Sequence, residues 1–318
     1  MTNRALVLLS GEGTTIPESE AKSLFLAYDE SSRFSSPSPR LLICDSEADP
    51  ALVGSRIAFA RRVGMLVEGR AEAAALLKGR RVRFRAFDLM GDDLQPDPAD
   101  YLAGVDATID LLDPEAELTL VRAGRDYLAV TRPMSMVQGW SRRSPRRRPF
   151  FHPAAIFPKL SRALVNMTRC REGDVFLDPF AGTGSLPLEA ELVGANAVSV
   201  DQSGAMARGE VANMKHFGQE WLGTIRADST YLPLKAVDAV ATDVPYGRAS
   251  STRGRTTAEV LERSLPALAE ALRPGKFMVL MHQKEVRVEA GPDYSVLEEH
   301  DLYVHKLLTR TISILRRR

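Results

Sequence analysis

The stretch VFLDPFAGTGSLPLEAELVGANAVSVD, residues 175–201, contains a strand, a glycine turn, a helix and a second strand in succession. A strand is expected from Asp174 to Asp178, a Gly-Thr-Gly turn follows, and Ser185 to Leu192 has helical spacing. The second strand is expected from Ala197 to Asp201. This order is typical of a βαβ unit, in which the two strands run parallel in one sheet.

Strands and helices continue to alternate downstream of this unit. Further strands are predicted at Leu222–Ala227, Val237–Asp243 and Lys276–Met281, helices at Gly204–His216 and Ala258–Leu272, and β-rich segments at Tyr294–Asp301 and Tyr303–Leu315. The alternation predicts an α/β fold with a doubly wound, mainly parallel sheet. In such sheets ligands bind beyond the carboxyl ends of the strands, at the topological switch point.

The glycine turn is suited to a bound cofactor. Gly182 and Gly184 lack the Cβ atoms that would block close approach, and the N–H groups that open the next helix can receive a carboxylate. Asp201 ends the next strand, where it can accept hydrogen bonds from both hydroxyls of a ribose. Pro187 stands where a dinucleotide-binding GxGxxG motif has its third glycine, so the turn departs from that motif. An ordinary strand-to-helix connection remains the alternative.

A second motif, DVPYGR, follows the apolar run AVDAVAT and spans residues 243–248. An exocyclic amine conjugated to a purine ring is a poor nucleophile, and the Asp243 carboxylate and a carbonyl near Pro245 can accept its two hydrogens. Tyr246 can stack on a base that has been taken out of its helix. The motif is therefore typical of amino-methyltransferases, with a tight turn that caps a strand as the alternative.

A third carboxylate, Asp228, follows the strand that precedes this motif. It can accept the amino group of a cofactor's adenine, or it can serve as an N-cap or turn residue. After the motif, Arg248 and the segment ASSTRGRTT form a candidate loop in which Arg253 or Arg255 contacts phosphate. An exposed loop without such a role is the alternative.

Composition restricts the class of protein. With 318 residues and 44% hydrophobic content, the chain is expected to form two domains, and its net charge of +1 neither favours nor excludes an acidic partner. No apolar run approaches the roughly 18 residues of a membrane span, and we expect a cytoplasmic protein. Cys44 and Cys170 are expected in the core, and because they form no paired ligand spacing we predict no metal.

The segment SRRSPRRR, residues 141–148, concentrates arginines around a proline and is predicted to be a linker. Guanidinium groups match phosphate oxygens, so the segment is a candidate RNA-binding strip, with a solvated hinge as the alternative. The candidate RNA-binding residues are Arg142, Arg143, Arg146, Arg147, Arg148, Lys159 and Arg248. Before this linker, short strands alternate with helical segments in an α+β pattern. The strands are expected at Ala5–Leu9, Arg40–Cys44, Val82–Phe87, Ala107–Leu111 and Tyr127–Val130, and the helices at Glu18–Ala27 and Ala51–Ala60.

Together, DPFAGTG, Asp201 and DVPYG resemble the tRNA guanosine-10 N2-methyltransferase family. RPFFHPAAIFPKLSRALVN, residues 148–166, resembles the family's segment between its RNA-binding and catalytic parts. FARRVGMLVEG and VDATIDLLDPEAELTLVRAGRDYLAV resemble the family's ferredoxin-like and THUMP domains. The resemblance implies a ferredoxin-like domain at 1–67, a THUMP-like RNA-binding domain at 68–133, an Arg-rich linker at 134–150 and a Rossmann-like class I methyltransferase domain with a seven-stranded sheet at 151–318.

The same resemblance implies the ligands and their residues. S-adenosylmethionine would be held by Asp178, Pro179, Phe180, Gly182, Thr183, Gly184, Asp201 and Asp228, and the target guanine by Asp243, Pro245 and Tyr246. The partner would be tRNA, with a small activating protein subunit as a further possible partner and a monomeric protein in the absence of RNA. Val244 departs from the family's DPPYG motif, which has proline at this position, and the THUMP region is short.

Three alternatives remain open at this point. An enzyme of the same chemistry could act on another guanine in tRNA or ribosomal RNA. A DNA adenine N6-methyltransferase would share the logic of the Asp243 motif. A non-catalytic RNA-binding protein could retain a vestigial methyltransferase fold.

Overall fold

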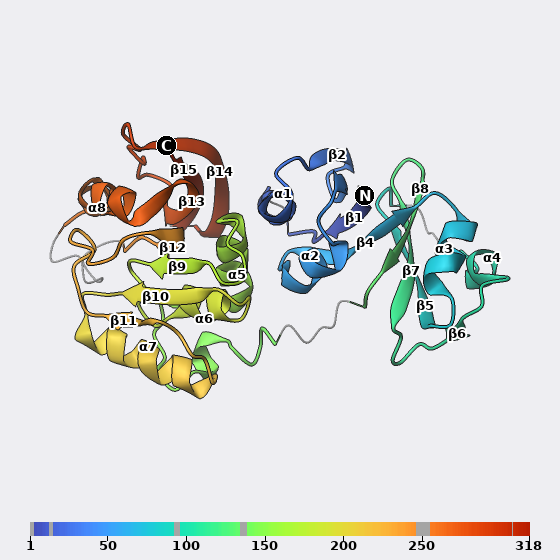
Figure 1. Ribbon diagram of the computed structural model, residues 1–318, viewed down its shortest axis with the longest axis horizontal. Coiled ribbons are helices and arrows are strands. Elements are labelled where there is room, and N and C mark those ends of the chain that lie inside the picture. The colour runs from blue at the N-terminus through green and yellow to red at the C-terminus, as the bar shows by residue number, and fades with distance from the viewer. Residues whose placement is uncertain (1–2, 13–14, 92–95, 134–138, 246–254, 307) are drawn as a thin grey trace. The chain divides into compact units, whose positions relative to one another are not determined.

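The computed structural model describes residues 3–12, 15–91, 96–133, 139–245, 255–306 and 308–318 (Figure 1). The chain forms two compact units. The N-terminal unit contains residues 1–13 and 17–138, and the C-terminal unit contains residues 139–318 together with residues 14–16. Each unit has its own sheet and its own hydrophobic clusters.

The C-terminal unit is built on a seven-stranded sheet with the order β11-β10-β9-β12-β13-β15-β14. Neighbouring strands from β11 to β13 are parallel, and β15 is antiparallel to both β13 and β14. The strands are β9 (Val175–Asp178), β10 (Asn196–Val200), β11 (Gly223–Ile225), β12 (Val237–Asp243), β13 (Leu272–Gln283), β14 (Tyr294–His305) and β15 (Leu308–Arg317). This architecture confirms the predicted Rossmann-like, mainly parallel α/β fold.

The order of the strands locates the ligand crevice. From β9 the chain continues to β10 on one side, whereas β12 pairs with the other side of β9, so the topological switch lies at β9. Figure 1 shows the arrowheads of β9 and β10 at the same edge of the sheet. Ligands of doubly wound sheets bind at this edge, beyond the carboxyl ends of the strands.

Helices cover the sheet of the C-terminal unit: α5 (Pro158–Met167), α6 (Ser185–Glu191), α7 (Gly204–His216) and α8 (Thr257–Ala271). The helices α5 and α6 pack against each other, and α5 also contacts β12. Buried side chains of α8, among them Val260, Leu265 and Leu268, pack with Leu177 and Val240 of the sheet. Removal of these aliphatic side chains from water stabilises the unit by about 1.5–3 kcal/mol each.

The N-terminal unit has an eight-stranded sheet with the order β2-β3-β1-β4-β8-β7-β5-β6. Its strands are β1 (Asn3–Leu9), β2 (Arg33–Ser38), β3 (Leu41–Ser46), β4 (Ala60–Val67), β5 (Arg81–Asp88), β6 (Thr108–Ile109), β7 (Ala116–Arg122) and β8 (Asp126–Thr131). Its helices are α1 (Ile16–Tyr28), α2 (Pro50–Arg56), α3 (Arg70–Leu77) and α4 (Pro98–Leu102). Because β4 pairs with β8, residues on both sides of the predicted boundary at 67 and 68 share one sheet. The ferredoxin-like and THUMP-like domains stay predictions.

Two predicted elements of this unit are shorter in the structure. The helix expected from Ala51 to Ala60 ends at Arg56, because Ala60 begins β4 and pairs there with β1. Its start is set by Asp49, whose side chain accepts a hydrogen bond from the Ala51 N–H at 2.8 Å. The strand expected from Ala107 to Leu111 is reduced to the two residues of β6.

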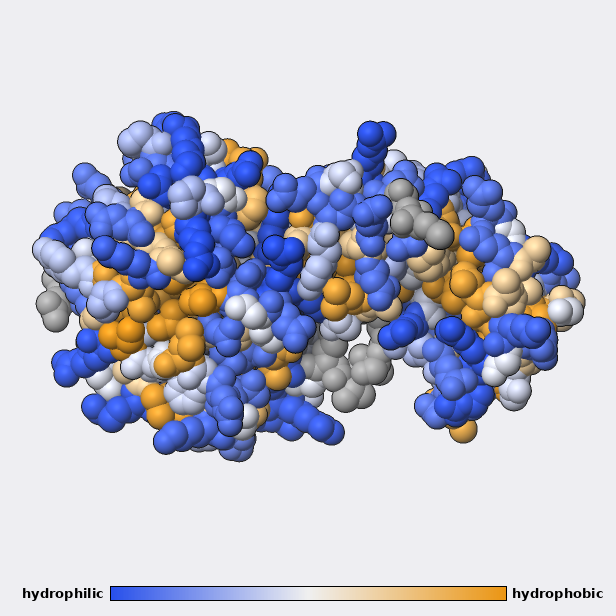
Figure 2. All heavy atoms as spheres, in the orientation of Figure 1, coloured by the Kyte–Doolittle hydropathy of each residue, from blue (hydrophilic) through white to orange (hydrophobic). Residues whose placement is uncertain are grey.

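Hydrophilic side chains cover much of the face shown in Figure 2, and hydrophobic side chains gather over parts of each unit. Most of the largest fully buried side chains lie in the hydrophobic clusters of the two units. Among the described residues, no helix combines the length and the apolar character that a membrane crossing requires.

Candidate functional site

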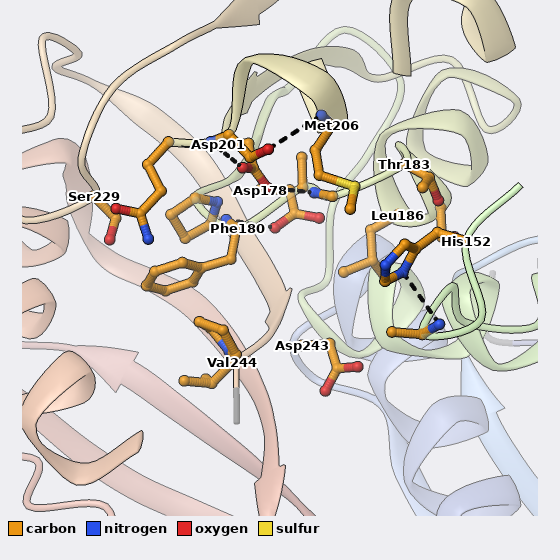
Figure 3. A pocket seen from close by; sticks show the side chains of 18 of the residues that line it. His152, Asp178, Phe180, Thr183, Leu186, Asp201, Met206, Ser229, Asp243 and Val244 are labelled. Atoms are coloured by element: carbon orange, nitrogen blue, oxygen red, sulfur yellow. Dashed lines mark hydrogen bonds between the residues drawn. The ribbon is translucent and has the colours of Figure 1, made fainter. Parts of the chain in front are cut away.

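A cavity of about 620 Å³ opens at the carboxyl ends of β9, β10 and β12. Its walls come from the turn after β9, from the residues after β10 and β11, from the end of β12, and from the loop 152–156. In the close view of Figure 3, Asp178 and Asp201 lie near each other, Asp243 and Val244 lie below them, and His152 stands at one side. The glycine turn, Asp201 and the motif that begins at Asp243 therefore meet at one cavity, as expected for parallel strands that end at the same edge of a sheet.

The glycine turn has a backbone that its glycines make possible. Gly182 has φ 55° and Gly184 has φ 79°, and both angles lie in the left-handed region that side chains disfavour. A Cβ atom at Gly184 would stand 2.6 Å from Cγ of the buried Glu210. A Cβ atom at Gly182 would meet nothing within 4 Å, and Gly182 lines the cavity. The turn is thus packed tightly on the Gly184 side and open on the Gly182 side.

Asp201 is held by backbone N–H groups of the turn and of the segment after β10. Its Oδ2 accepts a hydrogen bond from the Gly182 N–H at 2.9 Å, and its Oδ1 accepts one from the Ser203 N–H at 2.7 Å. Burial raises the pKa of this carboxyl, although both hydrogen bonds favour its ionised form. The side chain is 8% exposed and faces the cavity, so each oxygen keeps acceptor capacity for a ligand hydroxyl.

Asp178 is the most deeply buried carboxylate of the cavity wall. Its Oδ1 accepts hydrogen bonds from the Thr242 hydroxyl at 2.7 Å and from the Phe180 N–H at 3.0 Å. Burial raises the pKa of the Asp178 carboxyl to about 7, the two hydrogen bonds lower it, and the charges of Asp201 and Asp243 raise it further. Asp178 thereby connects the turn after β9 to β12 and fixes the geometry of the cavity floor.

Asp228 is engaged on both carboxylate oxygens. Its Oδ1 accepts hydrogen bonds from the Thr230 N–H at 3.1 Å and from the Thr230 hydroxyl at 2.9 Å, and its Oδ2 lies 3.5 Å from Nη1 of Arg255. Burial raises the pKa of Asp228, but the hydrogen bonds from Thr230 and the positive charge of Arg255 outweigh burial and lower it. Asp228 caps a turn and also lines the cavity, and its role toward a cofactor's adenine stays a prediction.

The end of β12 presents the residues of the second motif. Asp243 and Pro245 line the cavity, and the Pro245 carbonyl accepts a hydrogen bond from the Thr257 hydroxyl at 3.2 Å. The N–H of the buried Val244 donates to the Met281 carbonyl at 2.9 Å. A proline at position 244 has no N–H, so valine gives this chain one additional bond between the motif and β13. Tyr246 and Arg248 lie outside the described residues.

Sequence reasoning overlooked several residues of this site. His152 and Met206 line the cavity, and Nδ1 of His152 accepts a hydrogen bond from the Ala154 N–H at 3.3 Å. Arg310, on β15, lies with its Nη1 3.5 Å from Oδ2 of Asp243. Neither Met206 nor Arg310 belongs to a motif, and no sequence pattern relates them to the site. His152 stands within the family-like segment, which was the one signal that could have identified it.

The arginine-rich segment is not a uniform strip in the structure. Arg143 donates from Nε and Nη2 to the two carboxylate oxygens of Glu189 at 2.7 and 3.2 Å, and Glu189 also pairs with Arg162 at 2.8 Å. Arg148 is 5% exposed and donates to the Ser185 hydroxyl at 2.7 Å, and burial lowers its pKa to about 10. Arg143 and Arg148 therefore fasten the segment to α6, and we correct their expected role as phosphate contacts to a structural one.

Other predicted RNA contacts remain accessible. Arg142, Arg146 and Arg147 are exposed, and Pro145–Arg147 form a single 3₁₀ turn. Lys159 is partly buried at the start of α5. Within the part of the chain that the structure describes, no group of three or more His, Cys, Asp or Glu side chains could hold a metal ion. Cys44 and Cys170 are both buried free thiols, as predicted.

Known proteins are similar to this chain, and one family match covers most of the C-terminal unit that contains the cavity. Residues 145–307 match the sequence profile of a family described as the RMKL-like methyltransferase domain. The tRNA (guanine(10)-N2)-dimethyltransferase of Methanothermobacter thermautotrophicus is 32% identical over 213 residues, which cover 65% of this chain and 63% of that protein. The probable tRNA (guanine(10)-N2)-dimethyltransferase of Methanothermococcus thermolithotrophicus is 30% identical over 168 residues, or 50% of this chain and 98% of that protein.

A solved structure extends the likeness to both units. The crystal structure of TrmN from Thermus thermophilus aligns with 99% of this chain and 100% of its own chain, with a TM-score of 0.53 and 18% sequence identity. At this identity the likeness concerns the fold alone. The chain spans less than two thirds of the length of the Methanothermobacter relative.

Proposed function

This chain belongs to the family of RMKL-like methyltransferase domains, and we propose that it transfers one or two methyl groups from S-adenosylmethionine to the exocyclic N2 of a guanine in tRNA, at guanosine 10. The observation that carries the proposal is the convergence of the glycine turn, Asp201 and Asp243 on one cavity. In this proposal, a carboxylate for the reacting amine would stand beside the site for a nucleoside cofactor. The names of two relatives support guanosine 10 of tRNA as the target.

The residues present fit S-adenosylmethionine. The cavity volume of about 620 Å³ is within the range of small-molecule sites, and the open space at Gly182 admits a ligand against the backbone. Asp201 would accept the ribose hydroxyls, and Asp228 would accept the adenine amino group in place of Arg255. Phe180 and Met206 supply apolar surface to the same cavity. When bound, the cofactor supplies an electrophilic methyl group on a positively charged sulfur.

The chain's own contribution is to bind and orient the target amine. Asp243 would accept one hydrogen of the guanine amine, and a carbonyl of the Val244–Pro245 segment would accept the other. This directs the nitrogen lone pair toward the methyl group and stabilises the positive charge that develops on nitrogen. After transfer, the proton that the nitrogen loses would pass to the Asp243 carboxylate or to water. Tyr246 is proposed to stack on the extruded base.

RNA would be bound largely through its phosphates. The exposed Arg142, Arg146 and Arg147 precede the catalytic sheet and offer guanidinium groups to the backbone of the RNA. We propose that the N-terminal unit contains the ferredoxin-like and THUMP-like elements and grips tRNA. The cytoplasmic location, the monomeric state without RNA and a small activating subunit are further predictions of the same proposal.

The test is methyl transfer from labelled S-adenosylmethionine to unmodified tRNA transcripts, with the modified nucleotide located by nuclease digestion and mass spectrometry. We expect label at guanosine 10 that falls by about 10²–10³-fold in Asp243→Ala, because that variant has no carboxylate to accept the amine hydrogen. The product mass separates one methyl from two. Label on duplex DNA or on ribosomal RNA instead of tRNA would replace the proposed substrate, and binding of the cofactor without any transfer would favour a non-catalytic role.

A further inference from the structure

The register of three strands brings an arginine to the catalytic carboxylate. Asp243 pairs with Met281 across β12 and β13, and Gln283 pairs with Arg310 across β13 and β15. Cross-strand partners point to the same face of a sheet, and residues two apart on one strand share a face as well. Asp243, Met281 and Arg310 therefore project from the same face, although Arg310 is two strands away from β12.

The contacts agree with this register. Nη1 of Arg310 lies 3.5 Å from Oδ2 of Asp243 and 3.7 Å from Sδ of Met281. The side chains of Arg310 and Asp243 are only 14% and 16% exposed. Because water screens such a pair little, the interaction is stronger than that of an ion pair on the surface.

The charges around Asp243 indicate a role for Arg310. The same end of the sheet holds, besides the partly buried Asp243, two buried carboxylates, Asp178 on β9 and Asp201 after β10. Among the described residues that line the cavity, Arg255 is the only arginine or lysine, and it is paired with Asp228. A third carboxylate beside two buried ones is favoured to take up a proton unless a cation balances it. Arg310 contacts Asp243 from β15 and supplies that cation.

We propose that Arg310 is a positioning residue for the target amine, which holds Oδ2 of Asp243 and keeps that carboxylate ionised so that its other oxygen can accept an amine hydrogen. This inference rests on the proposed function, because it assigns a role to the carboxylate that binds the amine. Arg310 does not touch the reacting atoms in this role. Its effect is on the orientation and the charge of Asp243.

The test compares kcat and KM of four single variants and one double variant in the tRNA methylation assay. Arg310→Met removes the charge and keeps most of the length, and we expect kcat to fall about 10- to 100-fold, with KM for S-adenosylmethionine within about twofold of wild type. Arg310→Lys should recover part of kcat. In Asp243→Asn the carboxylate is absent, so adding Arg310→Met to it should lower kcat by less than about twofold more.

Arg317→Met is the matched control, since Arg317 lies on the same strand and pairs with Asp293 at 3.1 Å, outside the residues that line the cavity. It should leave kcat unchanged. Thermal unfolding of every variant identifies a general loss of structure. Equal kcat in wild type and Arg310→Met would overturn the inference, and so would full additivity of Arg310→Met with Asp243→Asn.

A second readout does not depend on turnover. The Asp243 carboxyl carbon, assigned by its disappearance in Asp243→Asn, can be followed against pH by ¹³C NMR in the full chain. We expect Arg310→Met to move the titration midpoint of the Asp243 carboxyl to higher pH. That variant keeps every other charged or titratable residue that lines the cavity, namely Asp178, Asp201, Asp228, Arg255 and His152. An unmoved midpoint contradicts the inference. Absence of methyl transfer by the wild type contradicts the proposed function instead, and the NMR result still stands.

Discussion

The two glycines of the turn after β9 should respond differently to the same substitution. Gly184→Ala places a methyl group 2.6 Å from Cγ of Glu210, which is fully buried and accepts a hydrogen bond from Ser199. Overpacking of this kind costs about 1–3 kcal/mol, and the left-handed φ of 79° adds about 1–2 kcal/mol. We therefore expect Gly184→Ala to lower the free energy of unfolding by about 2–5 kcal/mol.

Gly182→Ala is the matched control, because it has the same change and a similar φ of 55°, but its methyl group would meet no atom within 4 Å. Only the backbone strain applies, so we expect a loss of about 1–2 kcal/mol of stability. The new methyl group projects into open space beside the cavity. The affinity for S-adenosylmethionine should consequently fall by about tenfold or more, since a single misplaced methyl group in a site is worth about 1–3 kcal/mol.

Urea unfolding followed by circular dichroism measures the stability of both variants, and isothermal titration calorimetry measures cofactor binding. The expected pattern is a loss of stability of about 2–5 kcal/mol in Gly184→Ala, and in Gly182→Ala a smaller loss of about 1–2 kcal/mol together with a large loss of cofactor affinity. If the two variants were equally stable, the contact with Glu210 would not be the constraint that we infer. Unchanged affinity in Gly182→Ala would contradict the placement of the cofactor against this turn.

Three further predictions concern other parts of the C-terminal unit. Burial raises the pKa of Asp178 from its ordinary value of 3.8 to about 7, so between these pH values the unfolded chain releases a proton that the folded chain retains. The free energy of unfolding should therefore decrease on the order of 4 kcal/mol as the pH rises from about 4 to 7. Urea unfolding at several pH values should show a flatter dependence for Asp178→Asn, and an unchanged slope would assign the pH dependence to other groups. Val244→Pro removes the N–H that donates to the Met281 carbonyl at 2.9 Å, and we expect a loss of about 1–3 kcal/mol, measured by urea unfolding; equal stability would show that the bond is dispensable. Alanine in place of the three exposed linker arginines, Arg142, Arg146 and Arg147, should weaken tRNA binding. The slope of log K against log salt concentration should become smaller by about one for each phosphate that the variant no longer neutralises. An unchanged slope in filter binding would exclude these arginines as phosphate ligands.

Much of the catalytic fold was predictable because its signals are local. The apolar run that becomes β12 was predicted with its observed bounds, and Ser185 was predicted as the first residue of α6. Boundaries were less predictable where two elements compete for the same residues. The helix expected up to Ala60 ends at Arg56, since pairing of Ala60 with Leu9 of β1 takes those residues into a strand. Long-range pairing of this kind leaves no trace in the local sequence.

The arginine-rich segment shows the same limit for function. Composition alone predicts a basic, solvated linker, because it assigns every arginine the same environment. In the structure the buried carboxylate of Glu189 selects Arg143 and Arg162 as ion-pair partners, and Ser185 on α6 accepts a bond from Arg148. Only the fold distinguishes these structural arginines from the exposed ones.

The sequence by itself determined the parallel βαβ arrangement, the glycine turn and the carboxylates at the strand ends, since each depends on residue types at short spacing. The convergence of Asp178, Asp201 and Asp243 followed from that arrangement, because parallel strands end at one edge. The tertiary structure alone decided the contact between Arg310 and Asp243 and the close approach of Glu210 to Gly184. Both depend on registers and packing between segments far apart in the chain, and no local pattern of residues encodes such distances.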